Sequence, residues 1–335
     1  MEKNLLYRVD GGKVWGISMG HVRRASIVAG ALARDFKIVF VMKDYADGVA
    51  YIRKSGFQVE TIEISDDSDD TVIRICETHR PDRMIFDLNG TPYVKVFDYA
   101  RGEKIRTIVF DVSGKCAGVP DVLVNDTIVK EFTRYPHLEG RAVLALGPEY
   151  FVMEDPPAAA PIRDSVDFVL ITMGGSDPAG LTVKTLETLS GELSGLRMGV
   201  VLGPGFTEQA RVRDIAGVAG TVDVFENPPD FMSLLSKSDV VITAAGRTLL
   251  ECARLGRPCL VVPSIEHEEA TAAEYCRLTG GFNTGRWDDD STPGKIVSYL
   301  RQYRDSLRLR ETVSAAALKL VDGAGLERVL ALITG

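Results

Sequence analysis

The most informative segment of the chain reads Gly16-Ile17-Ser18-Met19-Gly20-His21-Val22-Arg23-Arg24. An apolar run before it predicts a first β-strand, Leu5 to Val9, and an apolar-periodic run predicts a helix, Val22 to Leu32. A glycine-rich turn at such a junction lets the backbone approach a ligand closely and presents N–H groups at the positive end of a helix. His21 would then lie beside a bound phosphate. The alternative is a glycine-rich connection with a solvated histidine, because a loose glycine pattern is weak evidence by itself.

Short β-rich runs alternate with helical patterns along the rest of the chain. Repeated βα units predict parallel sheets with helices on both faces, so the expected fold class is α/β. The segment from about Thr292 onward is expected to be helical. The predicted strands after the first are 37–42, 58–62, 83–87, 106–111, 121–125, 142–146, 167–172, 197–202, 221–225, 240–243 and 258–262.

The alternation is interrupted once, by the Pro- and Ala-rich segment Met153-Glu154-Asp155-Pro156-Pro157-Ala158-Ala159-Ala160-Pro161. Such a composition is typical of a connection between domains. We therefore expect two Rossmann-like, doubly wound domains, 1–152 and 166–335, joined by a linker at 153–165. Ligands of such sheets bind outside the carboxyl ends of the strands, here in a central cleft between the domains.

Composition excludes several classes of function. The 335 residues include 39 basic and 47 acidic side chains, and the net charge of −8 argues against a general nucleic-acid binder. No apolar run approaches the roughly 20 residues that span a membrane, and we expect a cytoplasmic protein without a signal peptide. The five cysteines are scattered, so neither a disulfide framework nor a zinc site is expected. His267 stands among glutamates without a second histidine, and we expect neither a metal nor a cofactor.

The second half of the chain contains two further strand–turn–helix junctions. In the first, the predicted strand 167–172 is followed by Gly174-Gly175-Ser176-Asp177-Pro178. Asp177 fits a helix N-cap and Pro178 the first helical position, with the helix continuing from Ala179. A well-capped turn with no ligand is the alternative interpretation.

The second junction follows the predicted strand 240–243 and reads Ala244-Ala245-Gly246-Arg247-Thr248-Leu249-Leu250-Glu251. The small residues leave space, and the N–H groups of residues 246–248 would face an anion at the start of the helix. Glu251, about one turn inside the helix, could accept hydrogen bonds from sugar hydroxyls. The alternative is that Glu251 completes a capping box with Thr248.

An ordered set of motifs resembles a known family. The matching segments are Gly20-His21-Val22-x-Arg24, Phe86-Asp87, Leu146-Gly147-Pro148-x-Tyr150, Gly174-Gly175-Ser176-Asp177-Pro178, Ala245-Gly246-x-Thr248-x-x-Glu251 and Asp322-Gly323-x-Gly325-x-x-Arg328. They occur in the same order in the UDP-sugar hydrolases of the pseudaminic acid pathway and in the spore coat polysaccharide proteins similar to them. The resemblance covers nearly the whole chain and implies the GT-B glycosyltransferase fold. It also implies that the second domain binds a nucleotide diphosphate, expected to be UDP, and that His21 lies near the anomeric carbon of the sugar.

These arguments assign the candidate site residues in three groups. The expected catalytic residues are His21, Asp10 and Asp87, with His21 as the base and the two aspartates orienting it or binding sugar hydroxyls. The expected phosphate or sugar contacts are Gly20, Arg24 and Glu268. The expected nucleotide-binding residues are Gly174, Gly175, Ser176, Ala245, Gly246, Arg247, Thr248 and Glu251.

The expected reaction is hydrolysis of a UDP-sugar by inverting attack of water at the anomeric carbon, with UDP and a free N-acetylated sugar as products. Backbone N–H groups at two helix ends and the Arg247 cation would stabilise the departing diphosphate. Transfer of the sugar to an acceptor and nucleotide-sugar binding without catalysis remain as alternatives, because one fold hosts many functions. The first loop departs from the family, with Asp10-Gly11-Gly12 where an Asp-Ser-Ser triad is usual.

Overall fold

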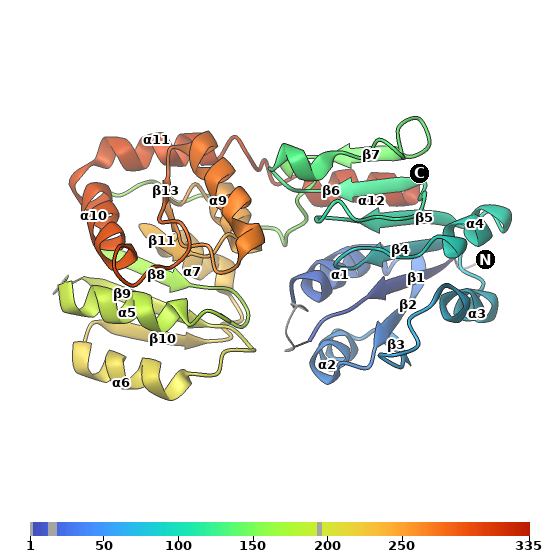
Figure 1. The fold of residues 1–335 in the computed structure, drawn as a ribbon, viewed down its shortest axis with the longest axis horizontal. Coiled ribbons are helices and arrows are strands. Elements are labelled where there is room, and N and C mark those ends of the chain that lie inside the picture. The colour runs from blue at the N-terminus through green and yellow to red at the C-terminus, as the bar shows by residue number, and fades with distance from the viewer. Residues whose placement is uncertain (1–2, 13–18, 193–195) are drawn as a thin grey trace. The chain divides into compact units, whose positions relative to one another are not determined.

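The computed structural model describes residues 3–12, 19–192 and 196–335 as two units, each of which is an α/β structure with its own sheet. The first unit comprises residues 1–154 together with 323–335, and the second comprises residues 155–322. Figure 1 shows both units, with the colour running along the chain. The turn residues Gly16, Ile17 and Ser18 lie outside the described residues.

The first unit contains a seven-stranded parallel sheet with the strand order β3-β2-β1-β4-β5-β6-β7. Its strands are β1 (Lys3–Val9), β2 (Phe36–Lys43), β3 (Gln58–Ile62), β4 (Arg83–Asp87), β5 (Arg106–Phe110), β6 (Val122–Asn125) and β7 (Val143–Leu146). Its helices are α1 (Met19–Leu32), α2 (Ala46–Lys54), α3 (Asp69–His79), α4 (Lys95–Gly102), the short η1 (Lys130–Thr133) and η2 (Pro148–Tyr150), and α12 (Gly325–Thr334). The order of the strands reverses between β1 and β4, which makes the carboxyl end of that pair the expected ligand position.

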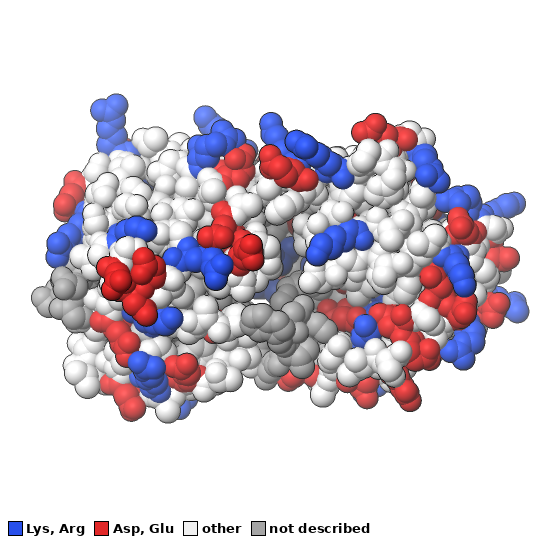
Figure 2. Space-filling view, in the orientation of Figure 1, with Lys and Arg blue, Asp and Glu red and all other residues white. Residues whose placement is uncertain are grey.

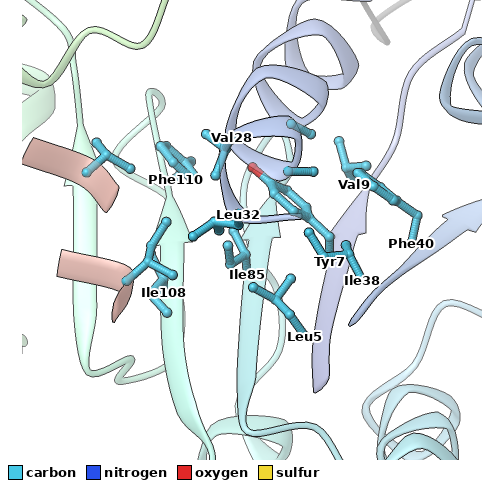
Figure 3. Close-up of a cluster of buried hydrophobic side chains, with 14 of the residues drawn as sticks. Leu5, Tyr7, Val9, Val28, Leu32, Ile38, Phe40, Ile85, Ile108 and Phe110 are labelled. Carbon is cyan, nitrogen blue, oxygen red and sulfur yellow. The ribbon is translucent and has the colours of Figure 1, made fainter. Parts of the chain in front are cut away.

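Apolar side chains on both faces of this sheet form the core of the first unit. On one face, Val28 and Leu32 of α1 pack onto Tyr7, Ile85 and Phe110 of the strands, as Figure 3 shows. The ring of Tyr7 stacks on that of Phe40 in the neighbouring strand, with ring centroids 5.1 Å apart. The central strands are therefore mostly apolar along their length, as expected where a parallel sheet is covered on both faces.

The second unit contains a six-stranded parallel sheet with the order β10-β9-β8-β11-β12-β13. Its strands are β8 (Phe168–Thr172), β9 (Arg197–Leu202), β10 (Val222–Glu226), β11 (Val240–Thr243), β12 (Cys259–Val261) and β13 (Phe282–Asn283). Its helices are α5 (Leu181–Glu192), α6 (Gln209–Ala219), α7 (Phe231–Lys237), α8 (Arg247–Arg254), α9 (Glu266–Thr279), α10 (Thr292–Asp305) and α11 (Leu307–Ala317). Here the order reverses between β8 and β11, so the turns after these two strands flank the switch point.

The last helix corrects the expected domain boundary, because α12 belongs to the first unit. Val329 and Ile333 of α12 are fully buried in the same core as α1 and β5. A side chain at Gly325 would collide with the backbone of Phe151, and Arg328 donates a hydrogen bond to the carbonyl of Glu149. The helical pattern from Thr292 does predict helices, but only this packing shows that the third of them leaves the second unit.

The Pro- and Ala-rich segment from Asp155 onward is held by the second unit. The carbonyl of Ala160 accepts a hydrogen bond from the buried Arg257. Buried Arg310 donates to the carbonyls of Arg163 and Asp164 at 2.9 and 2.7 Å. Two buried guanidinium groups thus fix the end of a segment that composition alone describes as a linker.

Candidate active site and nucleotide site

The ends of four strands in the first unit bring charged side chains together on the α1 face of the sheet. His21 and Arg24 lie in the first two turns of α1, which follows β1, and Asp87 is the last residue of β4. Val9 and Asp87 are register partners in the β1–β4 pair, so these residues meet where the strand order reverses. Asp126 follows β6, and Phe110 ends β5.

His21 and Asp87 form a close pair. The Nδ1 atom of His21 lies 2.6 Å from Oδ1 of Asp87. The carboxylate is fully buried, whereas the histidine side chain is 16% exposed. An ionised carboxylate only accepts hydrogen bonds, so Nδ1 carries the proton and Nε2 keeps its lone pair. The pair therefore presents a proton acceptor, held in one orientation, at the edge of the sheet.

Arg24 keeps Asp87 ionised. Its Nε and Nη2 atoms donate to the two oxygens of Asp87 at 2.8 and 2.6 Å. Burial alone would raise the pKa of Asp87, but the charge of Arg24 and the hydrogen bonds from Arg24 and His21 hold that pKa well below its usual range. Burial would likewise lower the pKa of Arg24, and the charges of Asp87 and Asp126 reverse that effect. Asp87 therefore stays ionised beside His21.

Arg24, an expected phosphate or sugar contact, meets buried side chains of its own unit in the structure. The side chain is only 2% exposed, and its guanidinium lies 4.7 Å from the centre of the Phe110 ring. A further nitrogen, Nη1, reaches Oδ2 of Asp126 at 3.4 Å. Neither Phe110 nor Asp126 is among the expected site residues, although both occupy the strand-end positions that identify Asp87.

Asp10, the third expected catalytic residue, lies in a separate network. Arg8 donates to both of its oxygens at 2.6 and 2.7 Å, and the backbone N–H of Lys43 donates to one of them at 2.8 Å. Arg8 also pairs with Asp67 at 3.1 Å. Asp10 therefore holds the ends of β1 and β2 together, and among the described residues it makes no hydrogen bond or ion pair with His21. Gly20 lies within α1, next to His21.

In the second unit, the expected nucleotide-binding residues gather at the carboxyl ends of β8 and β11, which are neighbouring strands with Thr172 opposite Thr243. Gly174 has a φ of +82°, a conformation that favours glycine, and Gly174, Gly175 and Ser176 are exposed. The helix α8 begins at Arg247, with exposed Gly246 as its N-cap and half-buried Arg247 and Thr248 in its first turn. Because Gly246 rather than Thr248 is the N-cap, the capping box is not formed.

The helix after Gly174 differs from expectation, and the difference changes which helix can hold an anion. Helix α5 begins at Leu181 rather than at Pro178. The carboxylate of Asp177 accepts from the N–H groups of Leu181 and Thr182 at 2.9 and 2.7 Å. Asp177 therefore already occupies the positive end of α5, whereas the N-cap of α8 has no side chain. Of the two helix ends expected to face the diphosphate, the start of α8 is the one without a capping side chain.

Two glutamates, Glu268 and Glu251, complete the expected site residues of the second unit. Oε2 of Glu268 accepts from the N–H and hydroxyl of Ser264, both at 2.8 Å, and Oε1 would lie 3.8 Å from a Cβ added at Gly246. A carboxylate here is suited to accept from hydroxyl groups rather than to contact a phosphate. The carboxylate of Glu251 is buried inside α8, and Ala245 is buried before it.

The turn at Gly174 is held by a second glycine-rich turn that the sequence analysis overlooks, Gly203-Pro204-Gly205 after β9. Gly205 N–H donates to the carbonyl of Gly175 at 2.8 Å. A Cβ at Gly203 would lie only 2.5 Å from the same carbonyl oxygen. The pattern of a strand followed by Gly-Pro-Gly is the signal that would have revealed it.

Of the other histidines, His79 and His137 have structural partners, and His267 is exposed in the first turn of α9. His79 pairs with Glu60 at 2.5 Å, and Nε2 of His137 lies 3.0 Å from the carbonyl of Cys116. Within the described ranges, no group of three His, Cys, Asp or Glu side chains is arranged to hold a metal ion. In the same ranges, no helix is both long and apolar enough to cross a membrane. On the face shown in Figure 2, acidic and basic side chains are interspersed over each unit.

No protein-family model matches the chain. One similar protein is the spore coat polysaccharide biosynthesis protein SpsG of Bacillus subtilis. It is 25% identical over 334 residues, and the match covers 97% of this chain and 96% of that protein.

Solved structures resemble the chain over its full length. MurG of Acinetobacter baumannii superposes with a TM-score of 0.67 at 14% identity, covering 99% of both chains. The spinosyn rhamnosyltransferase SpnG complexed with thymidine diphosphate gives 0.70 at 15% identity, covering 98% of this chain and 99% of that one. The UDP-GlcNAc 2-epimerase of Neisseria meningitidis bound to UDP-GlcNAc gives 0.63 at 11% identity, covering 99% of both. The chain thus has the GT-B fold, and the resemblance to the spore coat polysaccharide biosynthesis proteins that its motifs predict is confirmed over nearly its whole length.

Proposed function

We propose that this protein is a nucleotide-sugar hydrolase of glycan biosynthesis, which cleaves a UDP-sugar at the anomeric carbon and releases UDP and a free N-acetylated sugar. The observation that carries the proposal is the pairing of His21 Nδ1 with Asp87 Oδ1 at 2.6 Å, with Arg24 fixing the carboxylate from behind. Supporting it are the order of the sequence motifs, the similarity to SpsG, and the relatives of the same fold whose structures hold nucleotides or a nucleotide sugar.

His21 acts as the general base in this proposal. Its Nε2 accepts a proton from water as the water oxygen attacks the anomeric carbon, and the bond from that carbon to the diphosphate oxygen breaks. The imidazolium that forms is stabilised by the buried carboxylate of Asp87. Attack from the side opposite to the leaving group inverts the configuration of the anomeric carbon.

The second unit binds the nucleotide in this proposal. The N–H groups at the start of α8 receive the diphosphate and stabilise the negative charge that it gains on departure. Glu251 and Glu268 accept hydrogen bonds from ribose or sugar hydroxyls. The diphosphate is already a good leaving group, so a strong general acid is unnecessary.

A transferase that passes the sugar to an acceptor is the second candidate, favoured by the fold shared with MurG and SpnG. The same base would then deprotonate an acceptor hydroxyl instead of water. The two reactions differ in one requirement, which is that transfer needs an acceptor.

The test is UDP release from a panel of UDP-N-acetylhexosamines and their 6-deoxy diacetamido derivatives, with EDTA and without acceptor, by the wild type and His21→Asn. The proposal predicts rapid release by the wild type, loss of release in the variant, and equal UDP affinity of the two proteins by calorimetry. Release that requires an added sugar acceptor would establish the transferase. Binding of UDP without release under either condition would establish a binding protein.

A further inference from the structure

Two loops of the first unit, which follow the neighbouring strands β5 and β6, begin at the charged cluster that holds His21. Phe110 ends β5, and the centre of its ring lies 4.7 Å from the guanidinium of Arg24. Asp126 is the first residue after β6, and its carboxylate lies 3.4 Å from the same guanidinium. Arg24 also binds the carboxylate of Asp87, which is the partner of His21. Both loops therefore start beside the proposed catalytic base.

Three exposed cations lie on these two loops, and they are Lys115, Lys130 and Arg134. Among the described residues, none of their side chains takes part in an ion pair or a side-chain hydrogen bond. Glu131 is the one exposed acid in the described segments 111–118 and 126–134, because Asp111 and Asp126 are buried. The loops thus carry exposed positive charge, although the whole chain has a net charge of −8.

The loop after β5 holds Lys115 in a fixed position. The carboxylate of Asp111 accepts hydrogen bonds from the N–H and hydroxyl of Ser113 at 3.0 and 2.9 Å. It also accepts one from the N–H of Cys116 at 2.7 Å, so the segment around Lys115 is folded into a turn. A Cβ added at Gly90, in the turn that follows β4, would lie 3.4 Å from the Cβ of Lys115. Lys115 therefore stands against the turn that begins at the end of β4.

The same turn packs against η1, the short helix of the loop after β6. Lys130 is the first residue of η1, and Arg134 follows its last residue. A Cβ added at Gly114 would lie 3.3 Å from the carbonyl oxygen of Phe132 in η1. That carbonyl also accepts a hydrogen bond from Nδ2 of the buried Asn125 at 2.8 Å. The two loops are thus fixed side by side, and their three cations gather at the carboxyl ends of neighbouring strands.

We propose that Lys115, Lys130 and Arg134 form a binding site for a carboxylate on the sugar, and that the substrate is the UDP derivative of an N-acetylated hexuronic acid. The inference rests on the proposed function, which assigns the sugar to the first unit and the nucleotide to the second. Ammonium and guanidinium groups bind carboxylates through charge-assisted hydrogen bonds. Local cations also offset the repulsion between an acidic protein and an anionic substrate. A neutral N-acetylhexosamine gains neither effect.

The test is calorimetry on His21→Asn protein, in which turnover is blocked, with UDP, UDP-N-acetylglucosamine and UDP-N-acetylglucosaminuronic acid. The uronic acid derivative is expected to bind about tenfold more tightly than the neutral sugar nucleotide, and added salt should reduce this preference. Adding Lys115→Met, Lys130→Met or Arg134→Met should each reduce the preference by about two- to fivefold, and adding all three should abolish it. The matched control is Lys54→Met, which removes an exposed lysine at the end of α2 and should keep the preference.

Equal affinity for the two sugar nucleotides, or a preference that survives in the triple variant, would overturn the inference. An equal loss of affinity for UDP alone in the triple variant would also overturn it, because the cations would then bind the nucleotide.

An NMR titration of the wild-type protein with free N-acetylglucosaminuronic acid separates this inference from the proposed hydrolysis, because it needs neither nucleotide nor turnover. The acid is expected to shift the amide signals of residues 113–116 and 130–134, whereas neutral N-acetylglucosamine should leave them in place. If the acid shifts none of these signals, the inference is wrong, whether or not the protein hydrolyses a UDP-sugar.

Discussion

The substitution Asp87→Asn tests the arrangement around His21 most severely. The carboxylate of Asp87 is fully buried and accepts two hydrogen bonds from Arg24 and one from His21. An amide has one oxygen and one NH₂ group, so it turns a donor toward either Arg24 or His21. Removing one member of a buried ion pair costs about 3–5 kcal/mol. Because Asp126 still lies 3.4 Å from Arg24, we expect the lower end, about 3 kcal/mol.

The same change removes the group that sets the tautomer of His21. With the proton on Nε2 instead of Nδ1, the ring cannot accept a proton where the reaction needs it. Loss of an equivalent orienting carboxylate in a serine protease lowers kcat by about 10⁴-fold, and we expect a loss on the order of 10³- to 10⁴-fold here. UDP affinity should be unchanged, because Asp87 lies in the first unit.

The difference in the free energy of unfolding between the wild type and Asp87→Asn depends on pH. The pKa of Asp87 is lowered in the folded protein, so its stabilising contribution is complete above the ordinary aspartate value of about 3.9. The contribution is lost as the pH falls below that value, and the gap between wild type and Asp87→Asn should narrow there.

Asp111→Asn is the matched control. Asp111 is equally buried and follows β5 at the same sheet edge, but among the described residues its carboxylate accepts hydrogen bonds from Ser113 and Cys116 alone. Calorimetry and UDP release are measured for both variants. The reasoning is refuted if Asp87→Asn keeps turnover within a few-fold of wild type, or if Asp111→Asn loses as much turnover as Asp87→Asn.

Three more predictions follow from the glycines and the last helix. Gly246→Asp should weaken UDP binding at least tenfold, because it places a carboxylate at the start of α8, and the neutral Gly246→Asn should bind UDP better than Gly246→Asp. Both variants should keep the wild-type free energy of unfolding within about 0.5 kcal/mol. Equal UDP affinities of the two variants in calorimetry would exclude an anion site there. Gly203→Ala should also weaken UDP binding, because its Cβ would lie 2.5 Å from the carbonyl oxygen of Gly175. The control is Gly217→Ala, which has open space in α6 and should stabilise the protein by up to about 1 kcal/mol. The prediction is wrong if both variants bind UDP with the same affinity. Deleting residues 325–335 should destabilise the first unit by about 3–6 kcal/mol, because Val329 and Ile333 are fully buried there; hydrogen exchange that instead increased in the second unit would contradict the assignment of α12.

Most of the fold could be predicted because buried parallel strands carry an unambiguous signal. The runs 58–62, 83–87, 197–202 and 240–243 are the strands of the structure to the residue. Strand β13 could not be predicted, because two residues carry no period. The unit to which α12 belongs could not be predicted either, since an amphipathic helix does not reveal which core receives its apolar face.

The candidate site could be predicted only in part, for a related reason. Strand ends and glycine-rich turns mark the edge of a sheet, so His21, Asp87 and Gly246 could be named in advance. What each side chain meets there depends on which face of the sheet it lies on. Asp10 and Arg24 both lie close to the end of β1 in the sequence, yet they meet different partners. Asp10 is bound by Arg8, whereas Arg24 is buried against Asp87. Asp126 could not be named in advance, because only the structure shows that Arg24 faces two carboxylates.

The central claim is that water, activated by His21, displaces the diphosphate in a single step. The most direct measurement is proton NMR of the sugar during the first moments of hydrolysis of an α-linked UDP-sugar, before mutarotation equilibrates the anomers. The account predicts that the β anomer forms first and that His21→Asn forms neither anomer. If the α anomer formed first, or if His21→Asn hydrolysed the substrate at the wild-type rate, the claim would be contradicted.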